Sequence, residues 1–172
     1  IQTAWLLSSE DFFNREALGI NSLKLSAGYD VSGNDDVAIT ASRTSLSATR
    51  FMNNSVGLVL NNIGNTGIQW ETTHRLRVGL DLTEYNNILA FSLNFFKSYT
   101  NNLLTLKSLP EITGEGYYWS NDGSLENIGL DFGVRFKLLN RKNWKWELGA
   151  NATAYKNKIT ALPDGDYTTT IY

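Results

Sequence analysis

The sequence predicts an all-β fold of long antiparallel strands, and two observations carry this prediction. Apolar and polar residues alternate over long stretches, which is the period that places successive side chains on opposite faces of a strand. Short polar turns then alternate with much longer polar stretches between these segments. The 172 residues are enough for one ordinary domain.

The alternation is clearest from Ile68 to Leu82. Leucine and valine occupy every second position from Leu76 onward, and charged residues or glycine stand between them. The same pattern predicts further strands, which cover 23–30, 89–95, 128–138 and 144–158, and strand-like sequence also occurs at 1–7 and 167–172. The segment from Ser9 to Leu18 predicts a helix, since a serine cap and early acidic residues precede a short apolar face.

The connections between these strands differ in length. Thr83–Asn87 and Leu139–Asn143 predict tight polar turns, whereas Lys107–Asn127 and Ser32–Gly67 predict long loops. Short turns on one side and long loops on the other are typical of an outer-membrane β-barrel, in which the short turns are periplasmic and the long loops lie outside.

A soluble β-sandwich also alternates apolar and polar residues, so the alternation alone does not decide between the two classes. The segments 68–82 and 144–158 are about 15 residues long, compared with ~5–6 in globular proteins and ~9–11 for a tilted membrane-spanning strand. Aromatic residues also gather near the strand ends, as in the girdles of membrane barrels; these residues are Trp70, Tyr85, Tyr99, Trp144 and Trp146. Together these features favour the transmembrane barrel.

An open sheet of about six strands cannot span a bilayer, because lipid leaves the backbone groups of its two edges without hydrogen bonds. Further strands must therefore come from a longer chain, or the predicted loops must hide strands that close a small barrel. We expect a piece of a larger barrel.

Composition excludes several functions. The net charge of −2 argues against a nucleic-acid partner, which needs a clustered basic face. The chain has no cysteine and a single histidine, so we expect no disulfide, no multi-histidine metal site and no cofactor. The sequence has no nucleophile motif that His74 could activate as a general base, so we expect no enzyme activity.

One cluster suggests ligand binding. Tyr117, Tyr118 and Trp119 follow one another in the predicted loop that ends at Asn127. Aromatic faces in an outer loop can stack on a sugar or line a peptide site, although packing against neighbouring loops or the aromatic girdle is the more common explanation. These three residues are the candidate substrate-binding site.

The polar face also carries many charges, which could line a substrate path or form a hydrated network that supports the wall. The residues of this set are Glu71, Arg75, Arg77, Asp81, Arg135 and Lys137.

Five motifs in order give the chain a family resemblance. They are Leu23–Tyr29 followed by Gly33-Asn34, Trp70–Thr73 leading into Val78–Leu82, Phe95–Leu104 followed by Leu109-Pro110, Asn121–Gly129, and Trp146 with Asn151 and Lys156–Ile159. In this order and spacing, nearly the whole chain resembles the barrel region of the SusC/RagA-type TonB-linked outer-membrane proteins of Bacteroidetes. Ser26, Ile128 and Asp131 depart from the family's usual Arg, Lys and Glu.

The resemblance implies a bacterial outer-membrane importer of oligosaccharides or peptides. It would work with a SusD-like surface lipoprotein and draw energy through the TonB complex, which would contact parts of the protein absent here. Residues 1–172 would form part of one β-barrel domain of about 22 strands, with the plug and the remaining strands outside this chain. The alternatives are a small structural or adhesive outer-membrane barrel and a soluble β-rich module that binds carbohydrate.

Overall fold

The computed structural model describes residues 1–51, 55–84 and 86–163. Its backbone contacts divide the described chain into two compact units. Unit 1 contains residues 1–31, 74–98 and 127–157, and unit 2 contains the described residues of 32–73, 99–126 and 158–163. The predicted strand at 167–172 and the turn residue Tyr85 lie outside the described residues.

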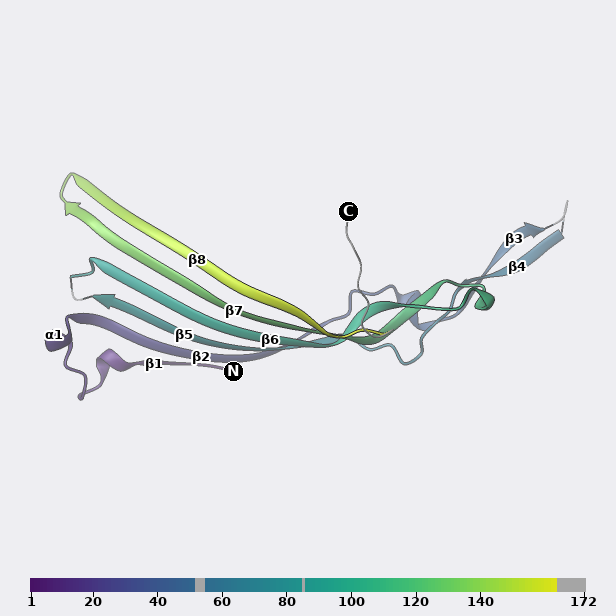
Figure 1. The fold of residues 1–172 in the computed structure, drawn as a ribbon, viewed down its shortest axis with the longest axis horizontal. Helices are drawn as coiled ribbons and strands as arrows, with labels where there is room; N and C mark the ends of the chain where they lie inside the picture. Colours follow the sequence, from purple (N-terminus) through teal and green to yellow (C-terminus); the bar gives the residue numbers. More distant parts are fainter. Residues whose placement is uncertain (52–54, 85, 164–172) are drawn as a thin grey trace. The chain divides into compact units, whose positions relative to one another are not determined.

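Six strands form one sheet in the order β1-β2-β5-β6-β7-β8 (Figure 1). Their bounds are β1 (Gln2–Leu6), β2 (Ile20–Asn34), β5 (Glu71–Glu84), β6 (Leu89–Ser108), β7 (Tyr117–Arg141) and β8 (Trp144–Ala161). Strand β1 pairs antiparallel with β2, with Gln2 opposite Gly28 and Leu6 opposite Lys24. Within the described residues the sheet is open, and β1 and β8 are its edges. The prediction of about six long antiparallel strands from a barrel wall is confirmed.

One end of unit 1 holds the short connections. The turn from β7 to β8 and the connection from β5 to β6 lie at the end where α1 (Arg15–Leu18) also lies (Figure 1). The side chain of Asn14 caps α1 by accepting a hydrogen bond from Ala17 N at 3.1 Å, and Gly19 ends the helix with a left-handed φ of 64°. The predicted helix from Ser9 to Leu18 is therefore wrong in extent: Ser9 lies in the 3-10 turn η1 (Leu7–Ser9), and the helix begins only after its asparagine cap.

Both predicted long loops contain strands. Strand β6 continues to Ser108 and β7 begins at Tyr117, so the loop predicted at Lys107–Asn127 shrinks to 109–116, with the 3-10 turn η4 (Glu111–Thr113) inside it. In the loop predicted at Ser32–Gly67, the turn η2 (Ile39–Ser42) precedes a separate two-stranded sheet of β3 (Ser45–Phe51) and β4 (Ser55–Asn62). The extensions of β6 and β7 lack the apolar alternation by which the other strands were predicted. Strand β4 does alternate, at Val56, Leu58 and Leu60, but it is short and stands among polar residues.

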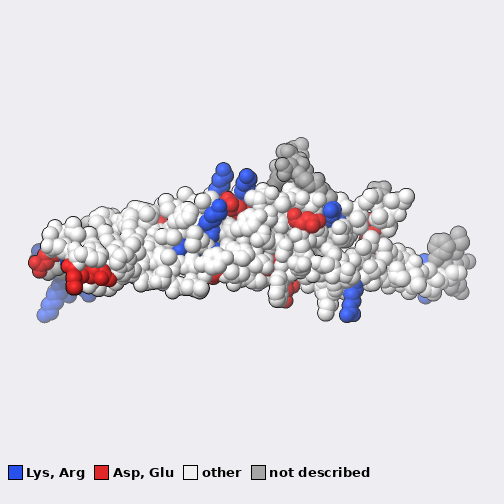
Figure 2. Space-filling model, turned by 90° about the horizontal axis from the view of Figure 1, so that it is seen from below, with Lys and Arg blue, Asp and Glu red and all other residues white. Residues whose placement is uncertain are grey.

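The apolar face of unit 1 has no protein cover. Phe91 and Phe132 meet edge to face across β6 and β7 with ring centroids 5.4 Å apart, yet Phe132 stays exposed, as do Leu130, Phe136 and Leu138 of β7. Among the described residues, Ala41 is the only buried apolar one. On the face that Figure 2 shows, wide areas carry no charged side chain, and the charges gather in a few places. A soluble sandwich would bury such residues in a core, whereas lipid can cover them in an outer-membrane barrel.

In the described part of the chain, no helix is both long enough and apolar enough to cross a membrane.

Candidate functional site

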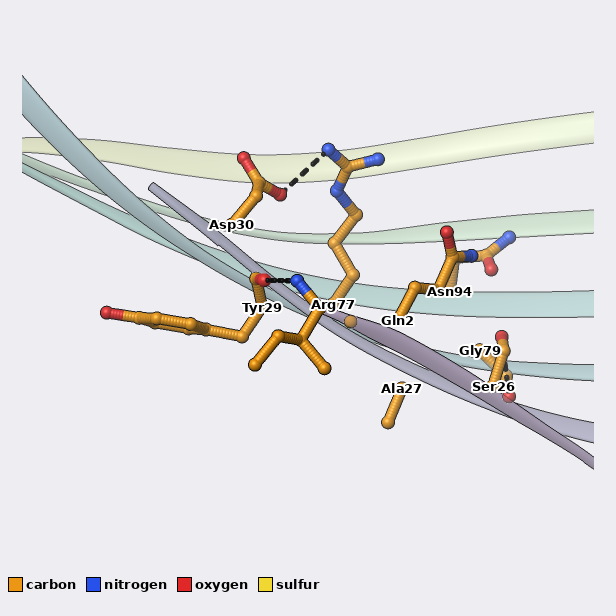
Figure 3. Close-up of a pocket in the computed structure, with 10 residues that line it drawn as sticks. Gln2, Ser26, Ala27, Tyr29, Asp30, Arg77, Gly79 and Asn94 are labelled. Atoms are coloured by element: carbon orange, nitrogen blue, oxygen red, sulfur yellow. Dashed lines mark hydrogen bonds and ion pairs between the residues drawn. The ribbon is translucent and has the colours of Figure 1, made fainter. Parts of the chain in front are cut away.

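The polar face of unit 1 carries one candidate site. Figure 3 shows Gln2, Asp30, Arg77 and Asn94 on one side of the sheet, and Ala27 with Tyr29 on the other. This separation follows from strand geometry, because successive residues of β2 point to opposite faces.

Asp30 is shared by two arginines in this site. Arg77 Nη2 lies 3.1 Å from Asp30 Oδ1, and Arg75 Nη1 lies 3.6 Å from Asp30 Oδ2. On the same face, Lys24 Nζ pairs with Asp81 Oδ2 at 2.8 Å. The alternation predicted that Arg75, Arg77 and Asp81 share a face, and the salt bridges agree with the expected charged network along the wall.

The floor beneath these charges is made of small residues. A hollow of about 450 Å³ is lined by Ser26, Gly28, Gly79, Asn94 and Arg77, among others. A Cβ on Gly79 would stand 2.6 Å from both Asn94 Oδ1 and Ser26 Oγ, so a larger residue there would have to displace both side-chain ends.

A second hollow of about 250 Å³ lies on the same polar face of unit 1. Its small lining residues include Ala90, Ser92, Gly133 and Gly149, and Arg135 also lines it. Sequence reasoning found the charges of this face but missed the small residues between them. The signal was present, because Gly28, Gly79, Gly133 and Gly149 stand among the polar residues of one register of their strands.

The aromatic cluster lies in unit 2 on a strand, so its prediction as part of a loop is wrong. Tyr117, Tyr118 and Trp119 are the first residues of β7. Tyr117 is 60% exposed and Tyr118 is half-buried. Trp119 lines a hollow of about 700 Å³ whose other lining residues are mostly apolar; these are Leu104, Thr105, Leu106, Ser108, Leu162 and Pro163.

Asparagine side chains hold this part of unit 2 together. Asn121 accepts a hydrogen bond from Gln69 N at 2.7 Å and donates to Gln69 O at 2.7 Å and to Asn102 O at 2.9 Å. Asn65 donates to the carbonyl of Trp119 at 3.0 Å. These asparagine side chains thus bond backbone groups of Gln69 and Asn102, and the bond from Asn65 fixes the backbone of Trp119. Sequence reasoning missed this role because asparagine is common in turns of every kind.

Acidic and hydroxyl groups also pair in unit 2. The hydroxyl of Ser120 donates to Asp122 Oδ2 at 2.6 Å, and this bond is the main cause that lowers the pKa of Asp122 below its ordinary value. Lys107 Nζ, at 3.5 Å from the same oxygen, adds to the effect. Glu71, the remaining acid of the predicted set, accepts hydrogen bonds from Asn34 Nδ2 and Leu104 N, both at 2.9 Å, which is a structural role.

The single histidine is paired with an aromatic residue. His74 Nδ1 lies 2.7 Å from the hydroxyl of Tyr29, and the two rings stack with centroids 6.2 Å apart. In the described part of the chain, no group of three or more His, Cys, Asp or Glu residues could hold a metal ion.

Comparison with known proteins agrees with this architecture. The family model described as "TonB dependent receptor-like, beta-barrel" matches residues 8–171. TonB-dependent receptor P3 of Formosa agariphila is 31% identical over 95% of this chain and 16% of its own length, and TonB-dependent receptor P26 of the same organism is 34% identical over 97% and 17%. TonB-dependent receptor SusC of Bacteroides thetaiotaomicron is 32% identical over 59% of this chain and 10% of its own.

Solved structures show the same fold. The structure of the RagAB peptide transporter superposes with a TM-score of 0.83 at 23% sequence identity, and the match covers 95% of this chain and 18% of that one. The chain thus spans about one sixth of the curated relatives that it matches over most of its length. Membership of a receptor family agrees with the predictions that this is no enzyme and that it resides in the bacterial outer membrane. The chain belongs to the TonB-dependent receptor family, of which it forms part of the β-barrel.

Proposed function

We propose that this chain is a section of the barrel wall of an importer, which takes up oligosaccharides or peptides across the outer membrane with energy delivered through TonB. The observation that carries the proposal is the family match over residues 8–171 on a sheet with one apolar and one charged face. In this arrangement the apolar face contacts lipid and the charged face lines the lumen.

All of residues 1–172 would belong to one barrel domain of about 22 strands with a plugged lumen. The open edges at β1 and β8 support this proposal. In a bilayer the free N–H and C=O groups of both edges need further strands as partners. The rest of a longer polypeptide would supply these strands and the plug.

The substrate class and the partner follow from the relatives. The superposed structure is described as a peptide transporter, which supports peptides, and the resemblance to SusC/RagA-type proteins adds oligosaccharides as candidate substrates. A surface lipoprotein of the SusD kind would capture the substrate and cooperate with the barrel. The membership in a TonB-dependent family supports the TonB complex as the energy source.

Trp119 is the most plausible substrate contact of the aromatic cluster, because it lines a hollow with an apolar lining while the asparagine contacts hold its backbone in place. Its indole face offers stacking to a sugar ring or contact to an apolar peptide side chain. Tyr117 and Tyr118 would extend this surface at the start of β7.

Uptake by cells that express the full-length protein tests the importer. A labelled mixture of oligosaccharides and peptides should accumulate in cells with the protein and TonB, and deletion of either should abolish accumulation. Retention of the protein in the outer membrane without any TonB-dependent uptake would contradict the proposal and favour a structural or adhesive barrel.

The contribution of Trp119 is tested with W119A in the same full-length protein. We expect substrate affinity to fall by about 1 kcal/mol, or roughly fivefold, as is usual for the loss of one aromatic contact. The matched control is W146A, which removes a 61% exposed indole from the apolar side of β8. Equal affinity for both variants and the wild type would exclude Trp119 as a substrate contact.

A further inference from the structure

We propose that the hollow around Arg77 on the polar face of unit 1 binds a carboxylate group, and that this group belongs to an acidic segment of the same polypeptide that fills the lumen. The inference rests on the proposed function, because it takes the charged face as the inner wall of a plugged barrel. It goes further by identifying the contact residues and the charge of the segment that they bind.

The charge balance points to a missing anion. Arg75 and Arg77 share one carboxylate, that of Asp30, so this group of three carries a net positive charge. The side chain of Arg77 is 60% exposed, and only one of its nitrogens contacts Asp30 within hydrogen-bonding distance. A guanidinium offers five N–H donors in a planar fork, which suits a second carboxylate.

The polar groups next to Arg77 suit the same ligand. Asn94 and Gln2 project to the same side of the sheet as Arg77 (Figure 3), and both line the hollow. Each carries an amide that can donate hydrogen bonds to an anion. Another cation of this face, Lys24, is already paired with Asp81 at 2.8 Å.

The floor favours a polypeptide as the source of the carboxylate. Gly28 and Gly79 have no side chain, and Ser26 has a small one, so another backbone can approach the wall closely. The second hollow continues the same kind of surface, with Gly133 and Gly149 in its lining. An extended series of shallow, small-residue contacts suits a packed chain segment better than a small solute.

The length of the relatives makes such a segment available. This chain matches only 16–17% of the length of the two Formosa agariphila receptors, so most of a comparable polypeptide lies outside these residues. At the depth of the apolar face, the lumen of a large outer-membrane transporter holds a plug.

Zero-length cross-linking of the full-length protein tests the inference. The variant R77K/D30N places a primary amine at position 77 and removes the carboxylate of Asp30, which would otherwise react first. A carbodiimide then joins this amine to any carboxylate in direct contact, and mass spectrometry of the digest identifies the partner. The matched control is R77Q/D30N, which lacks the amine, and native lysines react equally in both.

We expect a cross-link from position 77 to an aspartate or glutamate outside residues 1–172, and its absence in the control. A link to a carboxylate within these residues, such as Asp81, would overturn the inference, and so would the lack of any link. A product that appears only after addition of a uronic-acid oligosaccharide would also overturn it, since the carboxylate would then come from the solute.

Uptake measured in the same cells separates the two proposals. If cells with the wild-type protein import substrate but R77K/D30N forms no cross-link, the importer proposal stands and only the proposed carboxylate site is rejected. Wild-type cells without TonB-dependent uptake would contradict the importer itself, whatever the cross-linking shows.

Discussion

Replacing Gly129 with alanine should destabilise the sheet, because the ring of Phe96 occupies the space that the added methyl group needs. Gly129 is buried in β7, and a Cβ there would lie 2.6 Å from Phe96 Cε1, with Cζ also in contact. Overpacking of this kind costs about 1–3 kcal/mol. Alanine also restricts the unfolded chain more than glycine does, which stabilises the folded state by about 0.4–1 kcal/mol. We therefore expect the free energy of unfolding to fall by roughly 1–2 kcal/mol.

A double-mutant cycle isolates this contact. F96A alone should cost about 2 kcal/mol, which is roughly half the loss for a fully buried phenylalanine because the ring is half-buried. In the F96A background the methyl group of G129A enters the space that the ring vacates, while the carbonyl of Ala154 stays at 3.1 Å. The second substitution should then be nearly neutral, with a coupling of about 1–2 kcal/mol between the two sites.

The assay uses the full-length protein in detergent micelles. Samples heated to increasing temperatures are separated by electrophoresis, and the temperature at which half of the protein loses its folded mobility is compared among variants. G149A is the matched control on the neighbouring strand, since its Cβ would meet only Val134 O at an ordinary 3.5 Å, and its midpoint should not fall. Strictly additive losses in G129A/F96A would refute the reasoning.

Three further outcomes are expected. N121D should loosen the segment around Gln69, because a carboxylate cannot donate to the two carbonyls that Asn121 bonds; hydrogen exchange at 65–71 should rise by about tenfold, and unchanged exchange would count against the role of this side chain. D30N should destabilise the wall by at most ~1 kcal/mol, with the loss shrinking at high salt, since both arginine pairs are exposed; a salt-independent loss would contradict this. S120A should raise the pKa of Asp122 towards its ordinary value, because the hydrogen bond from Ser120 is lost. The ion pair of Asp122 with Lys107 needs the ionised carboxylate, so it is lost as pH falls through the pKa of Asp122, and in S120A this loss should occur at a higher pH. A pH titration of the cross-linking of Lys107 to Asp122 measures this shift, and an unshifted titration would contradict it.

The sequence pattern predicted the fold best where lipid constrains it. Alternation from Leu76 to Leu82 identified both faces of β5, because the membrane admits only apolar side chains on one side while the lumen accepts polar ones on the other. The tight turn from β7 to β8 followed from the same pattern.

The pattern failed where water can contact both faces. The extensions of β6 to Ser108 and of β7 back to Tyr117 have no apolar alternation, and backbone pairing maintains them together with side-chain contacts such as those of Asn121 and of Lys107 with Asp122.

The candidate site was predicted in part. The shared face of Arg75, Arg77 and Asp81 follows from their spacing, since residues two apart in a strand point the same way. The pairing of both arginines with Asp30 depends on the register between β2 and β5, which alternation within one strand cannot give. Trp119 was chosen for its chemistry, but the hollow that it lines arises from residues of three separate segments.

The most direct test of the account is a cysteine scan of β5 in the full-length protein, with one spin label at a time from Leu76 to Thr83. These 172 residues contain no cysteine that would compete for the label. We predict that labels at 76, 78, 80 and 82 are relaxed mainly by oxygen dissolved in lipid, and that labels at 81 and 83, which avoid Gly79 and the hollow around Arg77, are relaxed mainly by a water-soluble nickel complex. Equal access of the nickel complex to both sets would contradict the account, because it would mean that no lipid covers the apolar face.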